Sequence, residues 1–218
     1  QGGRGGLGNM HFKSSTNQAP REFTEGTPGE IKTLMLTMKT VAEVGLVGYP
    51  NAGKSTLLAQ LSAARPKTAA YPFTTRHPQV GTLVFDALHA LRVADVPGLL
   101  KDAHKGVGLG HDFLRHIERT VFLLFVIDMA GVDGRSPADD FLNLREELRL
   151  YRAELADRPY AVIANKMDEP AAKKNLTAFK RKTKEKPLPM CAELGEGVPE
   201  LKTQLFERFF PGETLLEI

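Results

Sequence analysis

The feature that most constrains this chain is a glycine-rich loop that begins at Gly48. Gly48, Gly53, Lys54 and Ser55 fall in the pattern glycine, four residues, glycine, lysine, and serine or threonine. The loop follows the apolar run Val44 to Val47 and precedes a stretch with helical patterning, which is the context of a phosphate-binding loop. In such a loop the glycines let backbone N–H groups point at phosphates, the lysine adds a positive charge and the hydroxyl binds magnesium. A glycine turn before an ordinary helix explains fewer of these residues, so the sequence predicts a polyphosphate site.

A second element, Asp-Val-Pro-Gly, occupies Asp95 to Gly98 at the end of the apolar run Leu91 to Ala94. An aspartate at this place can hold a magnesium-bound water, and the glycine N–H can sense a γ-phosphate. A plain strand-end turn would explain the element alone. The phosphate loop upstream favours the nucleotide role.

The third element is Asn-Lys-Met-Asp, at Asn165 to Asp168, directly after the apolar strand Tyr160 to Ala164. The Asp168 carboxylate can accept two hydrogen bonds from the N1–H and the N2 amine of guanine, donors that adenine does not present together. Lys166 can lay its aliphatic stem along the base, and Asn165 can bond both the base and the phosphate loop. The element therefore selects GTP over ATP.

Two segments between these elements are expected to respond to the γ-phosphate. Tyr71-Pro-Phe-Thr-Thr75 carries threonines that can reach the metal, and Thr75 is the expected ligand. The loop from Gly98 to Gly110 contains further glycines at alternate positions, which give it freedom to change shape. We expect these segments to act as two switches.

The pattern from Val41 onward, short apolar runs alternating with amphipathic stretches, predicts an α/β fold with a mostly parallel central sheet flanked by helices. A capping box is expected where Ser136 and Asp139 open the helix Pro137 to Ala156, and a shorter helix is expected over Pro199 to Phe209. The predicted strands are Glu43 to Val47, Thr82 to Phe85, Leu91 to Ala94, Phe122 to Ile127, Tyr160 to Ala164 and Leu188 to Cys191.

Residues 1–39 differ from the rest, being rich in glycine and turn formers, and bury little apolar surface by themselves. They suit either a disordered tail or the end of a glycine-rich domain, and the stretch Ile31 to Met38 alternates partly like a strand. We therefore expect two domains, 1–39 and the nucleotide-binding domain 40–218.

Composition excludes several classes of protein. With a single cysteine, Cys191, the 218-residue chain can form neither an intramolecular disulfide nor a cysteine metal cluster, which favours a reducing compartment. No apolar run reaches the length of a membrane span, so no membrane span is expected. The formal charge of +3 permits contact with nucleic acid without requiring it. The first residue is Gln1, so a leader peptide would not be visible.

In their order and their residues, these motifs resemble those of the Obg family of translation-factor-type GTPases. The resemblance is carried by Gly48-Tyr-Pro-Asn-Ala-Gly-Lys-Ser-Thr56, Tyr71-Pro-Phe-Thr-Thr75, Asp95-Val-Pro-Gly98, Gly108-Leu-Gly-His111 and Phe113-Leu-Arg-His-Ile-Glu-Arg-Thr120. Upstream, Gly2 to Gly8, Phe12-Lys-Ser-Ser-Thr-Asn17 and Gly26-Thr-Pro-Gly-Glu30 resemble the end of that family's glycine-rich N-terminal domain.

The resemblance implies a GTPase that binds GTP or GDP with Mg²⁺ and acts on precursors of the large ribosomal subunit, meeting rRNA, ribosomal proteins and other assembly factors. Leu99 stands where a glutamine would orient the attacking water, which implies slow hydrolysis. Asn51 corresponds to an asparagine that positions K⁺ in similar GTPases, although it could also simply stabilise the loop. Where the family has serine-alanine against the guanine, this chain has Cys191-Ala192, which keeps the Ala192 backbone N–H.

The expected site divides by role. Lys54, Thr75, Gly98 and Asn51 are the predicted catalytic residues, and Ser55, Thr75 and Asp95 are the predicted metal ligands. The predicted nucleotide-binding residues are Gly48, Tyr49, Pro50, Asn51, Ala52, Gly53, Lys54, Ser55, Thr56, Phe73, Thr74, Thr75, Asp95, Gly98, Asn165, Lys166, Asp168, Cys191 and Ala192.

Two other functions compete with a GTPase switch. Leu99 is compatible with a GTP-dependent scaffold that binds RNA or the ribosome with negligible hydrolysis, while an ATP-using phosphotransferase would share the phosphate loop but not Asp168. The basic balance and the resemblance favour the mitochondrial matrix, with a bacterial or other organellar compartment as the alternative.

Two clusters outside these motifs have weaker functional interpretations. The basic residues Lys173, Lys174, Lys180, Arg181, Lys182, Lys184 and Lys186 could bind RNA phosphates, although a solvated helix face explains them as well. The spacing of His104, His111 and His116 does not place all three on one helical face, which argues against a metal site.

Overall fold

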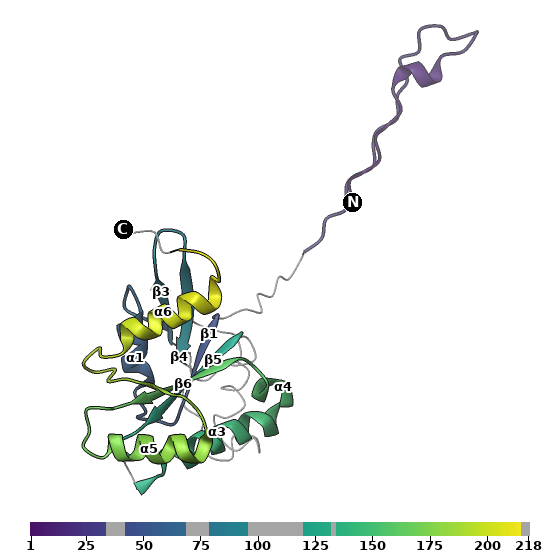
Figure 1. The fold of residues 1–218 in the computed structure, drawn as a ribbon. Helices are drawn as coiled ribbons and strands as arrows, with labels where there is room; N and C mark the ends of the chain where they lie inside the picture. The colour runs from purple at the N-terminus through teal and green to yellow at the C-terminus, as the bar shows by residue number, and fades with distance from the viewer. Residues whose placement is uncertain (34–41, 69–78, 96–119, 132–133, 215–218) are drawn as a thin grey trace. The chain divides into compact units, whose positions relative to one another are not determined.

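The computed structural model describes residues 1–33, 42–68, 79–95, 120–131 and 134–214. By contact, the chain separates into two units, Gln1–Met38 and Lys39–Ile218, which are described here one at a time (Figure 1).

Two glycine-rich segments pair along the first unit. The backbone N–H groups of Thr24 and Thr27 donate to the carbonyls of Leu7 and Arg4, both at 2.9 Å. The threonine hydroxyls accept the Leu7 and Arg4 N–H groups at 2.8 Å. The contacts recur every three residues, the repeat of a polyproline II helix. A Cβ added at Gly6 would lie 1.8 Å from the Thr24 carbonyl oxygen, so a larger residue would push the paired segments apart.

The first unit also departs from what the sequence predicts. The 3-10 helix η1 (Asn9–Phe12) lies between the paired segments. Residues 31–33, the described part of the stretch expected to resemble a strand, are not in a strand, and the rest of that stretch lies outside the described residues.

The second unit is built on a seven-stranded sheet in the order β2-β3-β4-β1-β5-β6-β7. Strands β4, β1, β5, β6 and β7 run parallel, β3 pairs antiparallel with β4, and β2 pairs antiparallel with β3. The strands are β1 (Val44–Val47), β2 (Lys67–Thr68), β3 (Gln79–Val84), β4 (Ala90–Asp95), β5 (Phe122–Asp128), β6 (Tyr160–Asn165) and β7 (Leu188–Pro189). The expected mostly parallel sheet is confirmed.

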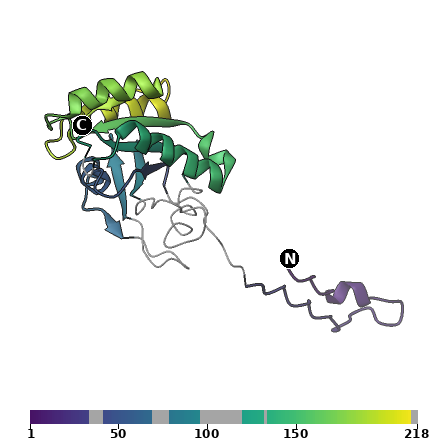
Figure 2. The ribbon, with the colours of Figure 1, turned by 90° about the horizontal axis from the view of Figure 1, so that it is seen from below.

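Helices cover both faces of the sheet (Figures 1 and 2). They are α1 (Lys54–Leu61), α3 (Pro137–Tyr151), α4 (Ala153–Ala156), α5 (Ala172–Thr183) and α6 (Val198–Phe209). Strand β5 shows why: Leu123, Phe125 and Ile127 pack with the core under α3 and α5, whereas Leu124 and Val126 pack with the core under α1 and α6. A strand buried on both faces reads as one continuous apolar run.

Three sequence expectations for this unit were wrong. The predicted long helix breaks at Arg152, whose backbone is extended, and gives α3 and α4. The Ser136 side chain makes no capping hydrogen bond to the helix. Instead, the Asp139 carboxylate that should complete the capping box forms an ion pair with Lys182 on α5. The last strand ends at Pro189, and Cys191 forms only an isolated bridge with Glu196.

Candidate functional site

The phosphate loop lies between β1 and α1, where two glycines allow close contacts. Gly53 has a φ of +94°, and a Cβ there would lie 2.2 Å from the Asn165 amide nitrogen. A Cβ at Gly48 would lie 2.5 Å from the Val126 carbonyl oxygen. Asn51 also adopts a left-handed conformation, with a φ of +64°. The loop therefore has the tight curl that lets backbone N–H groups converge on an anion.

Lys54, the first residue of α1, is buried within this loop. Its ammonium group donates to the carbonyls of Gly48 and Tyr49, each at 3.0 Å. Burial lowers the pKa of Lys54, and the nearby Asp95 carboxylate opposes that shift. The lysine thus places its ammonium group at the phosphate loop, where it can neutralise the negative charge of a polyphosphate.

Ser55 and Asp95 form the part of the site suited to a metal. The Ser55 hydroxyl donates to Asp95 Oδ2 at 2.5 Å, joining the start of α1 to the end of β4. Asp95 Oδ1 is buried and has no hydrogen-bond partner among the described residues. Burial raises the pKa of Asp95, while the Ser55 hydrogen bond and the Lys54 charge oppose the increase. A hydroxyl and an unpaired carboxylate oxygen are the hard ligands that Mg²⁺ prefers, so these residues fit the ion.

Asn165, the last residue of β6, connects the phosphate loop to the loop after β7. Its side-chain amide donates to the Ala52 carbonyl at 2.8 Å, and its side-chain oxygen accepts the Ala192 N–H at 3.0 Å. All three residues are buried. The Ala192 N–H, which was expected to face guanine, is thus engaged by Asn165.

Asp168 lies at the pocket that these contacts create. A pocket of about 210 Å³ is lined by Gly53, Thr56, Asn165, Lys166, Asp168, Glu169, Cys191, Ala192 and Glu193. The end of the phosphate loop and the carboxylate expected to recognise guanine therefore face one cavity.

Cys191 forms part of the wall of this pocket and is itself almost fully buried. Burial raises the pKa of its thiol, and a hydrogen bond with the Asp168 carboxylate raises it further. The thiol therefore stays protonated and donates to Asp168. It can hold that carboxylate in place as a serine hydroxyl would.

Lys166 shows a contact that sequence patterning missed. Its ammonium forms an ion pair with Asp128 Oδ2 at 2.7 Å. Asp128 ends β5, and β5 pairs with β6 so that Asp128 lies opposite Asn165. The only sequence signal for Asp128 is a carboxylate that directly follows a long apolar run.

The remaining predicted residues divide into two groups. Tyr49, Pro50 and Ala52 line a small hollow beside the end of β5, where the Arg135 guanidinium lies 5.0 Å from the centre of the Tyr49 ring. Arg135 was another contact that the sequence did not reveal. Phe73, Thr74, Thr75, Gly98 and Leu99 lie outside the described residues, as do His104, His111 and His116. In the described ranges, no cluster of three metal-ligating side chains occurs.

Family models match both units of the chain. Residues 43–166 match the model described as 50S ribosome-binding GTPase, and residues 1–40 match the model described as GTP1/OBG. In the parts that the structure describes, no helix is long and apolar enough to cross a membrane.

Curated relatives share half or more of the aligned residues. GTPase Obg of Akkermansia muciniphila is 50% identical over 208 residues, an alignment that covers 95% of this chain and 59% of that protein. GTPase Obg of Chloroflexus aurantiacus is 61% identical over 175 residues, covering 80% of this chain and 40% of that protein. The chain thus spans about half the length of the curated relatives it matches.

Solved structures share the fold. Era of Aquifex aeolicus, in a crystal structure with GDP.AlF4-, is 25% identical with a TM-score of 0.56, covering 82% of this chain and 60% of that chain. Era in complex with MgGDPNP and nucleotides 1506–1542 of 16S ribosomal RNA gives the same values. With the phosphate loop and both family models in agreement, the chain belongs to the Obg family of GTPases.

Proposed function

We propose that this chain binds Mg²⁺-GTP, hydrolyses it slowly and uses the nucleotide state to control docking on a precursor of the large ribosomal subunit. The observation that carries the proposal is the Asn165 link. It fixes the phosphate loop against the guanine-binding loops, so that Gly53 and Asp168 line one pocket. Such an arrangement binds a guanine nucleotide at both ends.

The chain's own groups divide the work of hydrolysis. The loop N–H groups and Lys54 would stabilise charge on the phosphates, and Ser55 and Asp95 would hold Mg²⁺ directly or through water. Bound Mg²⁺ would supply charge neutralisation at the phosphate oxygens. Asp168 would select guanine, and Asn51 would help position K⁺. The proposed γ-phosphate sensors Thr75 and Gly98 would order the two switch segments.

Ribosome docking is supported by the family rather than by a contact within this chain. The matching model is described as ribosome-binding, and the Era structure of similar fold carries ribosomal RNA. Because the chain spans only part of its relatives, its partners are part of the proposal. We propose the mitochondrial matrix as its compartment, from the basic charge balance and the single reduced cysteine; localisation to bacterial cytoplasm would overturn this.

Steady-state GTP hydrolysis, measured in K⁺ and in Na⁺ with and without large ribosomal subunits, tests the proposal. We expect slow turnover that subunits or K⁺ stimulate. Tight GTP binding with no hydrolysis under any condition would instead show a nucleotide-dependent scaffold. Equal displacement of GTP by ATP would contradict the role given to Asp168.

Lys54→Ala provides the matched variant for binding, with Lys202→Ala on α6 as its control. Lys54 is buried at the phosphate loop, whereas Lys202 is half-buried on a helix that contributes nothing to the nucleotide pocket. We expect Lys54→Ala to lose tight GTP binding while Lys202→Ala keeps it. Unchanged affinity of a folded Lys54→Ala protein would refute the assigned site.

A further inference from the structure

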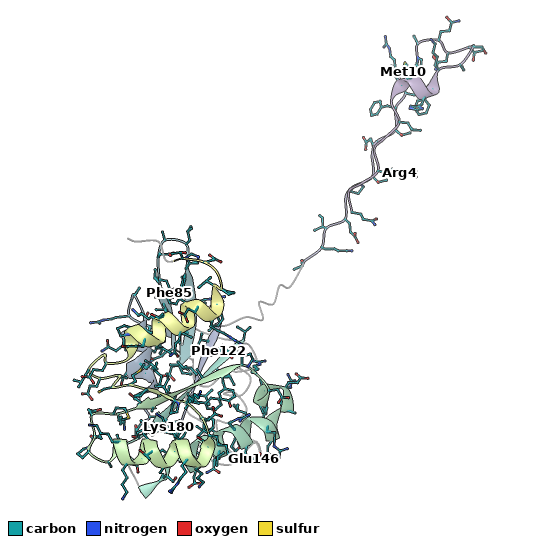
Figure 3. The ribbon with its side chains drawn as sticks, in the orientation of Figure 1. Arg4, Met10, Phe85, Phe122, Glu146 and Lys180 are labelled. Carbon is teal, nitrogen blue, oxygen red and sulfur yellow. The ribbon has the colours of Figure 1, made fainter. Side chains whose placement is uncertain are left out.

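Helix α5 presents a row of unpaired cations to solvent. We name as the α5 stripe the exposed residues Lys173, Lys174, Lys180, Arg181 and Lys184. Residues seven or eleven apart on a helix share a face, so the stripe consists of two adjoining rows, Lys173–Lys180–Lys184 and Lys174–Arg181. The second row lies opposite the buried Ala172 and Phe179, and the first lies to one side of it. The stripe is about 16 Å long at 1.5 Å per residue. Figure 3 labels Lys180 on this helix.

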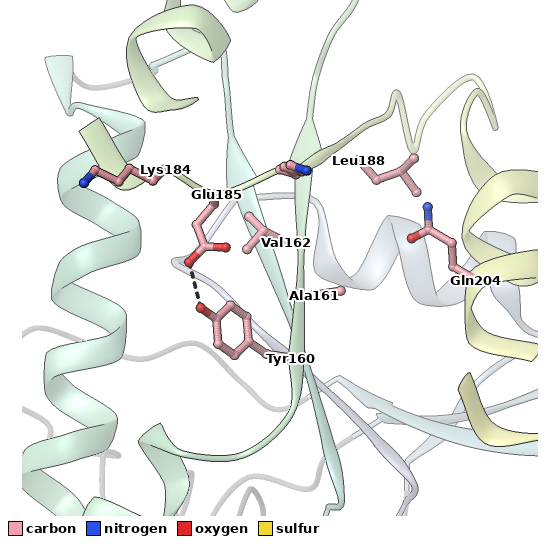
Figure 4. Close-up of a pocket in the computed structure, with 8 residues that line it drawn as sticks. Tyr160, Ala161, Val162, Lys184, Glu185, Leu188 and Gln204 are labelled. Atoms are coloured by element: carbon pink, nitrogen blue, oxygen red, sulfur yellow. Dashed lines mark hydrogen bonds between the residues drawn. The ribbon is translucent and has the colours of Figure 1, made fainter. Parts of the chain in front are cut away.

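Two of the acidic residues near the stripe are already engaged, and the exposed Glu169 before α5 forms no ion pair with it. Glu185, the acid that interrupts the basic run after α5, turns inward and accepts the Tyr160 hydroxyl at 2.7 Å (Figure 4). Asp139 on α3 pairs with Lys182, which is not part of the stripe. Within the described ranges, no acidic side chain pairs with any member of the stripe. The stripe therefore carries uncompensated positive charge.

Helix stability does not explain the stripe. Lys173 and Lys174 occupy the first turn of α5, where the positive end of the helix dipole disfavours cations, and no acid balances them there. Lys180 and Lys184 are four residues apart, a spacing at which like charges destabilise a helix. Lys184 adopts a φ of +62° at the helix end, where glycine would be less strained. The helix dipole favours only the stripe's cations at the C-terminal end, which are Lys180, Arg181 and the C-cap Lys184.

The surface suits a polyanion better than a membrane or a protein partner. None of the exposed large apolar side chains of the described residues lies on α5, so the helix offers nothing to insert into lipid. It also lacks the aromatic anchors that dominate protein interfaces. An elongated cluster of lysine and arginine without apolar anchors suits contact with several phosphates of a nucleic-acid backbone.

We propose that the α5 stripe binds the phosphate backbone of double-stranded RNA. The inference deepens the proposed function and rests on it for biological context, because it names the surface that would contact rRNA. Lys186 extends the basic surface: it lines, with Lys184, a hollow of about 380 Å³ between β6, the segment that follows α5, and α6. The contact is sequence-independent, since it involves phosphates alone.

The test uses the full chain and a fluorescein-labelled RNA duplex of 20 base pairs, with anisotropy measured from 50 to 200 mM KCl. The stripe variant carries Lys173→Gln, Lys180→Gln and Arg181→Gln. Its control carries Arg65→Gln, Arg149→Gln and Lys202→Gln, which remove the same formal charge from elsewhere on the second unit. We expect the stripe variant to bind about tenfold or more weakly at 100 mM salt, with a salt slope lower by about three. We expect the control to bind within twofold of the unaltered chain.

Equal losses in both variants would show a response to net charge and overturn the proposal, as would unchanged binding by the stripe variant. Loss of binding to phosphatidylserine vesicles without loss of RNA binding would assign the stripe to membranes instead. GTP hydrolysis is measured on the same samples. A stripe variant with normal hydrolysis but weak RNA binding supports the inference. If the unaltered chain showed no hydrolysis but bound RNA through the stripe, only the proposed function would be contradicted.

Discussion

Asn165 offers the sharpest test of how the site is assembled. Replacing it with alanine leaves the Ala52 carbonyl and the Ala192 N–H buried and without their partner. Each buried polar group left unsatisfied costs about 1–3 kcal/mol. We therefore expect Asn165→Ala to lower the free energy of unfolding by roughly 3 kcal/mol in total. For a domain of this size that corresponds to a fall in Tm of about 6–12 °C.

The same substitution should weaken nucleotide binding, because it frees the guanine-binding loops from the phosphate loop. We expect at least a tenfold weaker affinity, about 1.4 kcal/mol, for a fluorescent GDP analogue. Thermal unfolding gives Tm, and fluorescence titration at a temperature where the variant is folded gives the affinity.

Asn175→Ala is the matched control. Asn175 is half-buried and makes one side-chain hydrogen bond, to the Met129 carbonyl at 2.8 Å. It should cost about 1 kcal/mol and leave nucleotide affinity unchanged. If Asn165→Ala were no less stable than this control and bound nucleotide normally, the link would not be organising the site.

Three further predictions follow from individual side chains. Asp168→Asn should weaken GTP binding by at least about a hundredfold and raise the affinity for XTP relative to GTP. The reason is that an amide can donate to the xanthine carbonyl that replaces the guanine amine; competition binding measures both affinities. The His89 ring donates hydrogen bonds to the carboxylates of Asp86 and then Glu213, and these bonds raise the pKa of His89. The stability that His89 adds should therefore be complete below its unfolded-state pKa and disappear as pH rises through its folded-state pKa, which Tm measured from pH 5 to 9 would show. Cys191→Ala should weaken GTP binding by about two- to tenfold, because it removes the thiol hydrogen bond that holds the Asp168 carboxylate; competition binding measures the affinity.

Each of these predictions has an internal control. His11→Gln alters an exposed histidine and should not change the pH profile that His89→Gln flattens. Cys191→Ser keeps a hydrogen-bond donor beside Asp168 and should bind GTP within about twofold of the unaltered chain. Unchanged affinity of Cys191→Ala would show that the thiol does not hold Asp168. If Asp168→Asn lost GTP affinity without any gain in relative XTP affinity, Asp168 would have a structural role only.

Sequence patterning recovered the sheet because its central strands are buried on both faces. The run from Phe122 to Ile127 has no polar interruption and could only be an interior strand. The short edge strand β2 (Lys67–Thr68) has no such signature and was not predicted. The capping box did not form: the Asp139 carboxylate bonds Lys182 on α5, a tertiary contact that no local pattern reveals, and also the Ser136 side chain.

The candidate site shows the same contrast between residues found from local sequence patterns and residues brought together only by the fold. Gly53 and Asp168 could be predicted because each belongs to a short loop whose residues are consecutive in the sequence. Asp128 could not be, since its partner Lys166 becomes adjacent only through the pairing of β5 with β6. Strand order is a property of the whole sheet and is not encoded in either strand.

The parallel register explains why distant residues meet here at all. Strands β1, β4, β5 and β6 are parallel, so their carboxyl ends, which precede or include Gly48, Asp95, Asp128 and Asn165, lie along one edge of the sheet. Ligand sites in such sheets form at that edge, because each strand delivers its next residue there. Asn165 then joins loops more than 100 residues apart with a single side chain, since it is 113 residues from Ala52. The stability of the sheet is thereby coupled to the alignment of the site, which is why one substitution at Asn165 should lower both.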